Sequence, residues 1–352
     1  YNDARSHLDI GRRVVEGLKS GLAQLGSVWL PLPHLLMVPT IWNDFMWHSG
    51  LAGTLPSMIS FVATGIVIYL FLKRFGVDIL GSVLGVVVFV ANINVLYLQS
   101  TAMTELLLLA TVTAGIYKLV AWHQDRSIIS LVHAAFFIML STLVRYEGWF
   151  LLFVASGLIL FHTIRTRGYK TAEGTVILFG TLAAFGIALW LLWNLLIFKD
   201  PLYFALGPFS ARAQQAQLEQ AGNLITKGNL WLSFQTYMYA LIFTSYMYQV
   251  IIGAVGAIVL WFDKSLPVGV RIASTALFAP FLFNILALYL GHSVLFIQGI
   301  NGDTWFNARY GVMMMPSIAI FIGYLIYRAT TFRWVIIGLL VFVLFFVFTN
   351  GD

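Results

Sequence analysis

The sequence contains no cysteine among its 352 residues, which excludes disulfide bonds and thiol chemistry within this chain. Charged residues are also scarce. They make up 10% of the chain, whereas a soluble domain carries about 25%. No basic run or nucleic-acid-binding motif is present, and the net charge of +6 is modest, so no nucleic-acid partner is expected. Low-complexity tracts, clear internal repeats and a separate soluble domain are also absent from the sequence.

Apolar residues dominate instead, at 60% of the chain, and the mean hydropathy is +0.88. Because a helix needs about 20 apolar residues to cross a bilayer, the composition predicts an all-α polytopic transmembrane helical bundle of about ten spans. We treat residues 1–352 as one transmembrane domain. The predicted spans are 51–73, 79–98, 102–121, 127–144, 149–164, 174–198, 231–262, 270–290, 309–327 and 334–349.

A further apolar stretch, 25–47, is interrupted by Pro31, Pro33 and Pro39. Proline removes a backbone donor and breaks regular helix, so a re-entrant or interfacial segment is expected here rather than a span.

Positive charge in short loops predicts the orientation of a multi-pass cell-membrane protein. If the ten spans alternate, one side holds most loop cations and is expected to be cytoplasmic. The opposite, outer side then holds residues 1–50 as a first loop, 199–230 as a long loop, and most of the carboxylates. A polar site on the outer face explains this acidic bias, and longer outer loops explain it equally well. The cytoplasmic loop cations are Lys73, Arg74, Arg126, Arg165, Arg167, Lys170, Lys264, Arg271, Arg328 and Arg333.

The first outer loop begins with a charged amphipathic helix, which Asn2 or Asp3 can cap. One interpretation is an interfacial anchor. The other makes Asp3 a general base or an orienting carboxylate at the membrane surface, with Arg5 and His7 lining the same substrate pocket. The apolar residues expected to share one face of this helix are Leu8, Val14, Val15 and Leu18.

Four other candidate groups lie at the outer ends of predicted spans or in the first loop. His34, in the Pro-rich segment, is either a structural histidine or a substrate-pocket residue that binds phosphate or shuttles a proton. Glu105 opens an apolar helix that Ser100 or Thr101 could cap, and a carboxylate at a span edge is also a functional candidate.

The remaining two groups are the nearly loopless Arg145-Tyr146-Glu147 turn and the Arg309-Tyr310 pair. Each arginine can hold a phosphate with its guanidinium fork. The alternatives are an Arg145–Glu147 interfacial pair and Arg309 snorkelling to the interface.

These motifs, in this order, resemble the GT-C superfamily of membrane glycosyltransferases. That group includes protein O-mannosyltransferases, aminoarabinose transferases and oligosaccharyltransferases. The resemblance is carried by the acidic residue of the first outer-loop helix, Thr104-Glu105, Arg145-Tyr146-Glu147-Gly148, and Arg309-Tyr310 leading into Pro316. It implies transfer of a hexose or pentose from a polyprenyl-phosphate donor to a protein, lipid or glycan acceptor on the outer face, with inversion.

By similarity, Asp3 is the catalytic residue, while Arg309, Arg145 and Tyr310 contact the donor phosphate. Glu105, Glu147 and Tyr146 are expected in the substrate pocket. The paired acidic residues of the family are reduced here to one carboxylate in Asn2-Asp3-Ala4, so no metal ligand is assigned, although Mg or Mn remains a candidate cofactor. The family also implies a further span before residue 1.

Two other functions are compatible with the composition. A transporter or flippase of lipid-linked saccharides would use charges deep within spans, or broken helices in paired repeats. A non-catalytic subunit of a membrane complex would need neither. Asn92, Asn194 and Asn284 lie within or near the predicted spans, where amides commonly join helices.

Overall fold

The computed structural model describes residues 2–350, and within this range the chain is helical with no strands. The first half comprises α1 (Asn2–Val15), η1 (Leu22–Leu25), α2 (Leu32–Ile41), α3 (Asp44–His48), α4 (Leu51–Arg74), α5 (Ile79–Val90), α6 (Ile93–Gln99), α7 (Glu105–Asp125), α8 (Ile128–Thr142) and α9 (Glu147–Arg167). The second half comprises α10 (Tyr169–Phe198), α11 (Tyr203–Leu206), α12 (Ala211–Gln220), α13 (Leu230–Ser245), α14 (Met247–Phe262), α15 (Val268–Ser274), η2 (Thr275–Phe278), α16 (Ala279–Tyr289), η3 (Ala308–Met314), α17 (Met315–Arg328), η4 (Thr330–Phe332) and α18 (Arg333–Asn350).

Seven helices of the described chain are long and apolar enough to cross a membrane, or up to nine if each bent pair counts as one span. The prediction of ten spans is therefore not confirmed. Predicted span 127–144 is the 15-residue α8, and predicted span 231–262 is two helices that meet at 106°. The chain turns there because Tyr246 adopts a left-handed φ of 64°.

The predicted span 79–98 is also bent, by 65° between α5 and α6. Asn92 explains the bend, because its side chain accepts a hydrogen bond from the backbone N–H of Val95 and so begins a new helix. The same amide donates to the Thr244 carbonyl oxygen at 2.8 Å. Asn92 therefore joins two helices, as its position in the sequence suggested, and it also breaks one.

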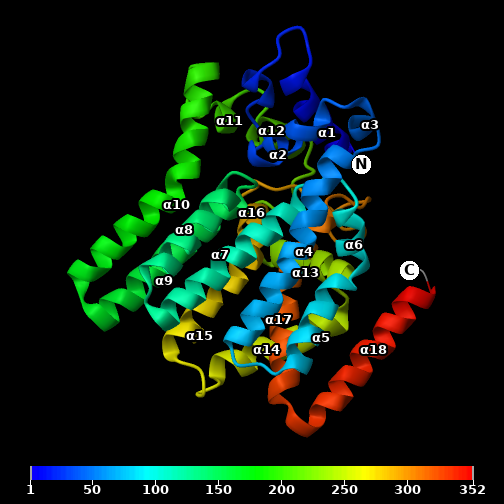
Figure 1. Ribbon diagram of the computed structural model, residues 1–352. Helices are drawn as coiled ribbons and strands as arrows, with labels where there is room; N and C mark the ends of the chain where they lie inside the picture. The colour runs from blue at the N-terminus through cyan, green and yellow to red at the C-terminus, as the bar shows by residue number, and fades with distance from the viewer. Residues whose placement is uncertain (1, 351–352) are drawn as a thin grey trace.

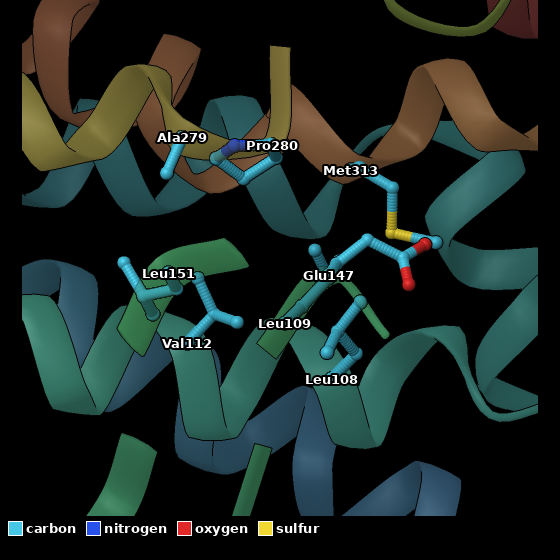
Figure 2. Close-up of a pocket in the computed structure, with 8 residues that line it drawn as sticks. All are labelled: Leu108, Leu109, Val112, Glu147, Leu151, Ala279, Pro280 and Met313. Carbon is cyan, nitrogen blue, oxygen red and sulfur yellow. The ribbon is translucent and has the colours of Figure 1, made fainter. Parts of the chain in front are cut away.

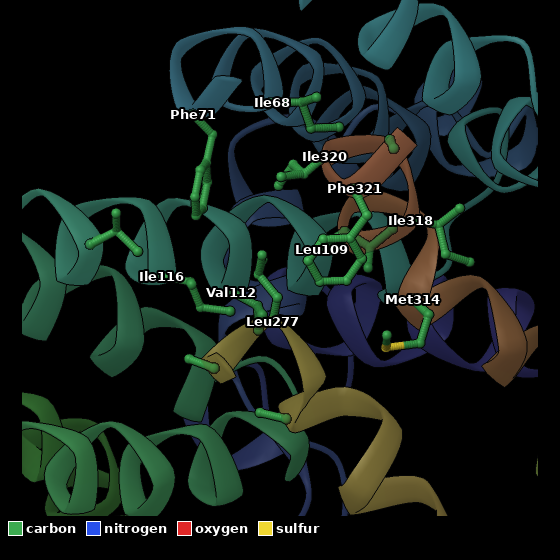
Figure 3. Packing of buried hydrophobic residues seen from close by; sticks show 14 of the residues in the cluster. Ile68, Phe71, Leu109, Val112, Ile116, Leu277, Met314, Ile318, Ile320 and Phe321 are labelled. Atoms are coloured by element: carbon green, nitrogen blue, oxygen red, sulfur yellow. The ribbon is translucent and has the colours of Figure 1, made fainter. Parts of the chain in front are cut away.

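The core lies along α7 and α17 (Figure 3), and both helices are almost entirely buried. Leu109, Val112 and Ile116 of α7 pack with Ile318 and Phe321 of α17 in one continuous apolar cluster. Hydrocarbon gives little hydrophobic drive between helices, so close packing has to hold the spans together.

Small residues provide that close packing between α5 and α17. A side chain added at Gly323 would lie 2.8 Å from the carbonyl oxygen of Gly81, so glycine is required at this crossing. By contrast, α10 and α18 flank the bundle (Figure 1). They expose long rows of apolar side chains, as expected for surfaces that contact lipid.

The two ends of the bundle differ in what covers them. The segment 2–48 and helices α11 and α12 cover one end (Figure 1). The loops at the other end are joined by three ion pairs. These are Arg74–Asp125 at 3.8 Å, Arg333–Asp78 at 3.3 Å and Arg328–Asp263 at 2.8 Å. The orientation of these ends relative to the cell remains a prediction.

The first loop forms short helices, none long enough to span a bilayer, as the prolines predicted. The predicted apolar face of its first helix is partly wrong. Leu18 lies beyond the end of α1 and is fully exposed, whereas His7, Ile10 and Val14 are buried. That burial follows the spacing of one helix face against α2.

The predicted cap of α7 is also wrong. Thr104 occupies the N-cap position, and the hydroxyls of Ser100 and Thr101 instead donate to the carbonyl oxygens of Tyr97 and Leu98.

Gly148 holds the turn between α8 and α9 in place. A Cβ atom there would lie 2.4 Å from the carbonyl group of Ser141, so Gly148→Ala has to push the two helices apart. We expect a loss of about 1–3 kcal/mol of stability, measured as thermal unfolding in detergent. Gly157→Ala is the matched control, because the same helix has open space at that position. Equal unfolding temperatures for the two variants would contradict this packing.

Candidate functional site

Five charged side chains from four distant segments form one continuous network at the end of the bundle covered by segment 2–48. Arg309, at the start of η3, is ion-paired with Asp3 of α1, and its Nε lies 2.9 Å from Oε1 of Glu105. Arg145 Nη1 lies 3.6 Å from the same oxygen, and its Nη2 lies 2.9 Å from Oε1 of Glu147. The structure thus brings together Asp3, Glu105, Arg145, Glu147 and Arg309, all selected from the sequence.

Glu105 lies at the centre of this network. It opens α7, where the helix N-terminus favours a negative charge, and its side chain is completely buried. Its Oε2 atom has no hydrogen-bond partner in the structure. A buried carboxylate is tolerated only if it is paired, and two guanidinium groups provide that pairing.

Tyr310 lies beside both arginines. The guanidinium carbon of Arg145 is 5.0 Å from the centre of its ring, and that of Arg309 is 5.5 Å from it. Burial alone would lower the pKa of Arg145, but Glu147, Tyr310 and Glu105 together raise this pKa above its ordinary value. Arg145 is therefore a permanent cation, held within an apolar bundle end.

Tyr146 fixes the turn that carries Arg145. Its hydroxyl donates to the Val28 carbonyl oxygen at 3.0 Å, and its ring stacks against Phe204 of α11. Burial raises the pKa of Tyr146, so its hydroxyl stays protonated. Through these contacts Tyr146 connects the charged network with the first loop and with the long loop 199–230.

His7 and His34 form a buried pair next to the network. Nδ1 of His7 lies 2.8 Å from Nε2 of His34, and Trp29 packs on the His7 ring with centroids 4.5 Å apart. Burial lowers the pKa of His7 to about 4, and burial with the neighbouring His7 lowers that of His34 to about 3. Both rings are therefore neutral at neutral pH.

The histidine pair predicts a loss of stability in acid. A histidine whose folded pKa is depressed stabilises the fold fully above its unfolded pKa of about 6.5, and loses that contribution as the pH falls towards the folded value. Between pH 6.5 and 4 we expect His7 to contribute a loss on the order of 3 kcal/mol. Thermal unfolding across this range measures it. His7→Gln should make the profile shallower by the His7 contribution while that of the buried His34 remains, whereas His48→Gln, at an exposed position, should leave the profile unchanged.

Arg5 does not join the network. Its side chain is 86% exposed and lies 3.8 Å from Asp9 on the same helix. Arg12 is a charged residue of the same helix that sequence reasoning did not single out. It donates hydrogen bonds to the carbonyl oxygens of Ile41 and Trp42 and forms an ion pair with Asp44. Arg12 therefore links α1 to the end of α2 and the residues that follow it.

An open cavity of about 370 Å³ lies next to Arg309. Sequence reasoning did not predict it, because it forms where two apparently continuous spans, 79–98 and 231–262, are broken. Its walls come from α6, α13 and the start of η3, with Trp305 before η3. The lining residues are Asn94, Tyr97, Leu98, Phe243, Thr244, Trp305, Ala308, Arg309 and Val312.

A much smaller space of about 10 Å³ lies on the other side of the network, beside Glu147 (Figure 2). Figure 2 shows the Glu147 carboxylate near Met313 and Leu108, among otherwise apolar residues. The space has room for about one water molecule and none for a substrate. Glu147 therefore pairs with Arg145 in buried surroundings, whereas Asp3 and Arg309 are partly exposed.

The carboxylates of the network do not fit a resident divalent cation. Asp3 and Glu105 are both paired with Arg309, whose guanidinium occupies the position between them that a shared cation would need. Across residues 2–350 no group of three or more His, Asp or Glu side chains is arranged to hold a metal ion.

Comparisons with known proteins identify the fold. No protein-family model matches the chain, and no curated protein matches it. Among solved structures, the crystal structure of ArnT from Cupriavidus metallidurans bound to undecaprenyl phosphate is similar, with a TM-score of 0.61 over 93% of this chain. This chain has a GT-C fold.

The match to the GT-C fold rests on shape, since the two sequences are only 14% identical. The chain spans 56% of the length of that ArnT. The GT-C fold agrees with the resemblance carried by Glu105, Arg145 and Arg309, and it confirms a multi-pass membrane protein.

Proposed function

We propose that this protein is a membrane glycosyltransferase that transfers a sugar from a polyprenyl-phosphate donor to an acceptor on the outer face of the membrane, with inversion. The observation that carries this proposal is the convergence of Asp3, Arg309, Glu105 and Arg145 beside an open cavity, at one end of a GT-C fold. A lipid-linked donor is consistent with the undecaprenyl phosphate bound by the similar ArnT.

Arg309 is the donor-phosphate ligand in this mechanism. It is the arginine of the network that lines the 370 Å³ cavity, and its side chain is 26% exposed. Its guanidinium neutralises the charge that develops on the phosphate as the glycosidic bond breaks. Tyr310 lies against both guanidiniums, and Arg145 places a second positive charge close to Arg309.

Asp3 is the general base. The acceptor hydroxyl oxygen attacks the anomeric carbon, its proton passes to the Asp3 carboxylate, and the bond from the anomeric carbon to the phosphate oxygen breaks. The products are the glycosylated acceptor and the free polyprenyl phosphate. One displacement inverts the anomeric centre and needs no covalent intermediate.

Donor binding also has to free Asp3. The network holds three carboxylates, Asp3, Glu105 and Glu147, and two guanidiniums, so its formal charge is −1 (two minus three) before any phosphate arrives. An added phosphate must displace one carboxylate from an arginine. Glu105 and Glu147 are 0% and 6% exposed, whereas Asp3 is 42% exposed, so Asp3 is the group that moves. The displaced carboxylate is then unpaired and able to accept a proton.

The two rival functions differ from this one in measurable ways. A transporter would move a lipid-linked saccharide without breaking its glycosidic bond, and a non-catalytic subunit would do neither. A bent helix pair lines the cavity, as in some transporters, but the charges cluster at one end of the bundle rather than at its middle.

The test is a turnover assay with the purified protein, a radiolabelled polyprenyl-phosphate sugar and candidate acceptors. We expect sugar transfer and release of polyprenyl phosphate. In Arg309→Gln, retention of polyprenyl phosphate should weaken at least about tenfold, the loss of one charge-assisted contact. Arg13→Gln is the control, since it removes an equal charge from an exposed position on α1. Translocation of the intact donor without cleavage would overturn the proposal.

A further inference from the structure

A second polar cluster lies at the opposite end of the bundle. Helix α7 runs from Glu105 to Asp125, and 21 helical residues extend roughly 30 Å, so His123 lies far from the network around Glu105. Helix α9 likewise runs from Glu147 to Arg167 and brings His162 to the same distant end. The rings of His123 and His162 are 4.7 Å apart.

His123 has a hydrogen-bonding atom with no partner. Its side chain is 4% exposed, and its Nδ1 lies 2.9 Å from the carbonyl oxygen of Leu119, which can only accept. The proton is therefore on Nδ1, and a neutral ring then offers a lone pair at Nε2. That Nε2 atom is buried and has no partner in the structure.

Arg126 has an unpartnered donor in the same cluster. Its Nη2 donates to Nε2 of His162, while its Nη1 is buried and has no hydrogen-bond partner. Arg126 has a left-handed φ of 55° at the end of α7. A non-glycine residue rarely adopts this conformation, so the fold holds Arg126 there at a cost.

Within residues 2–350 no carboxylate forms an ion pair with Arg126. Asp125 is adjacent in the chain, but it accepts from Ser127 and Ser130 and lies near Arg74 instead. Burial and the nearby Arg167 lower the pKa of Arg126, as expected for a cation among cations. The cluster thus pairs an excess positive charge with two unused buried atoms, one a donor and one an acceptor.

We propose that His123, Arg126 and His162 form a binding site for a phosphate group that retains one proton. Its P–OH donates to Nε2 of His123, and an anionic oxygen accepts from Nη1 of Arg126. Phosphate monoesters have a second pKa near 6, and the second pKa of inorganic phosphate is higher, so both keep such a proton in part at neutral pH. Sulfate and phosphodiesters lack this proton, so they can accept a hydrogen bond from Arg126 but cannot donate one to His123. This site is independent of the proposed transferase function.

The experiment measures phosphate binding to the full chain purified in phosphate-free detergent, by titration calorimetry. We expect inorganic phosphate to bind at least about tenfold more tightly than sulfate, the difference of one buried hydrogen bond. Arg126→Gln and His123→Phe should each weaken phosphate binding by about the same factor.

Arg165→Gln is the matched control. It removes one positive charge from the same end of the protein, but its guanidinium lies over Phe161 at 4.5 Å, outside the cluster. Phosphate affinity should stay within about twofold of the wild type. Thermal unfolding of each variant without phosphate distinguishes lost binding from a lost fold.

Nanodiscs of phosphatidylcholine with added phosphatidic acid or phosphatidylglycerol separate the two sources of phosphate. A higher unfolding temperature with phosphatidic acid, but not with phosphatidylglycerol, identifies a lipid headgroup as the ligand. Calorimetric binding of inorganic phosphate identifies a soluble ligand. Either result supports the site, provided that Arg126→Gln weakens it at least about tenfold. Equal binding of sulfate, equal effects of Arg126→Gln and Arg165→Gln, or binding of neither phosphate source would overturn it.

Discussion

Asp3→Asn will reduce the rate of sugar transfer by about 10²–10⁴-fold, the usual contribution of a general base. Asparagine has nearly the same shape but cannot accept the acceptor proton. Within residues 2–350 the Asp3 side chain forms an ion pair with Arg309 and no other ion pair, and it is 42% exposed, so the variant should fold. The readout is the single-turnover rate with a labelled polyprenyl-phosphate sugar.

Binding of the donor distinguishes the catalytic role of Asp3 from a binding role. In the free protein its carboxylate occupies Arg309, where the donor phosphate has to bind. Removing that charge removes a competitor, so Asp3→Asn should retain polyprenyl phosphate at least as tightly as the wild type. Slower transfer with unchanged or tighter binding is the pattern expected of a base.

Asp9→Asn is the matched control for this experiment. Asp9 lies on the same helix, its side chain is 46% exposed, and it is 3.8 Å from Arg5 and outside the network. Its replacement should leave the transfer rate within about twofold of the wild type. Full activity in Asp3→Asn, or an equal loss in Asp9→Asn, would show that the first helix is an anchor only.

The sequence predicted which residues belong to this site better than it predicted which of them form ion pairs with each other. Glu105, Arg145 and Arg309 were identifiable because each is an ionisable residue at the end of an apolar helix, where charge is costly unless it has a use. The pairing of Asp3 with Arg309, across 306 positions of the chain, could not be predicted. It depends on how α1 packs on the bundle, and periodicity within one helix carries no such information.

The cavity was missed for a related reason. The run 231–262 is mostly apolar and contains no charged residue, proline or other sign of the 106° turn. The turn arises because Tyr246 adopts a left-handed conformation and because Asn92 and Asn94 both donate to the Thr244 carbonyl oxygen. These are tertiary contacts between segments about 150 residues apart. The length of an apolar run limits the number of spans but does not determine where they bend.

Glu105→Gln will produce the largest loss of stability among single changes in the network. The carboxylate is completely buried, and one oxygen serves both Arg309 at 2.9 Å and Arg145 at 3.6 Å. Glutamine leaves two guanidiniums facing each other across a neutral amide. Removing one partner from a buried charge pair costs about 3–5 kcal/mol, so a large drop in the unfolding temperature is expected.

A double-mutant cycle tests whether this cost comes from the arginines. Arg145→Gln removes one of the two unbalanced charges, so the double variant should be destabilised less than the sum of the single variants. Glu16→Gln is the matched surface control. Glu16 also pairs with an arginine, Arg12, but is 64% exposed, and its loss should cost less than about 1 kcal/mol of stability.

Additive effects of Glu105→Gln and Arg145→Gln in the double-mutant cycle would mean that Glu105 does not hold the two cations together. Because the mechanism depends on Glu105 keeping Arg309 in place after Asp3 leaves, additivity would weaken the catalytic proposal as well.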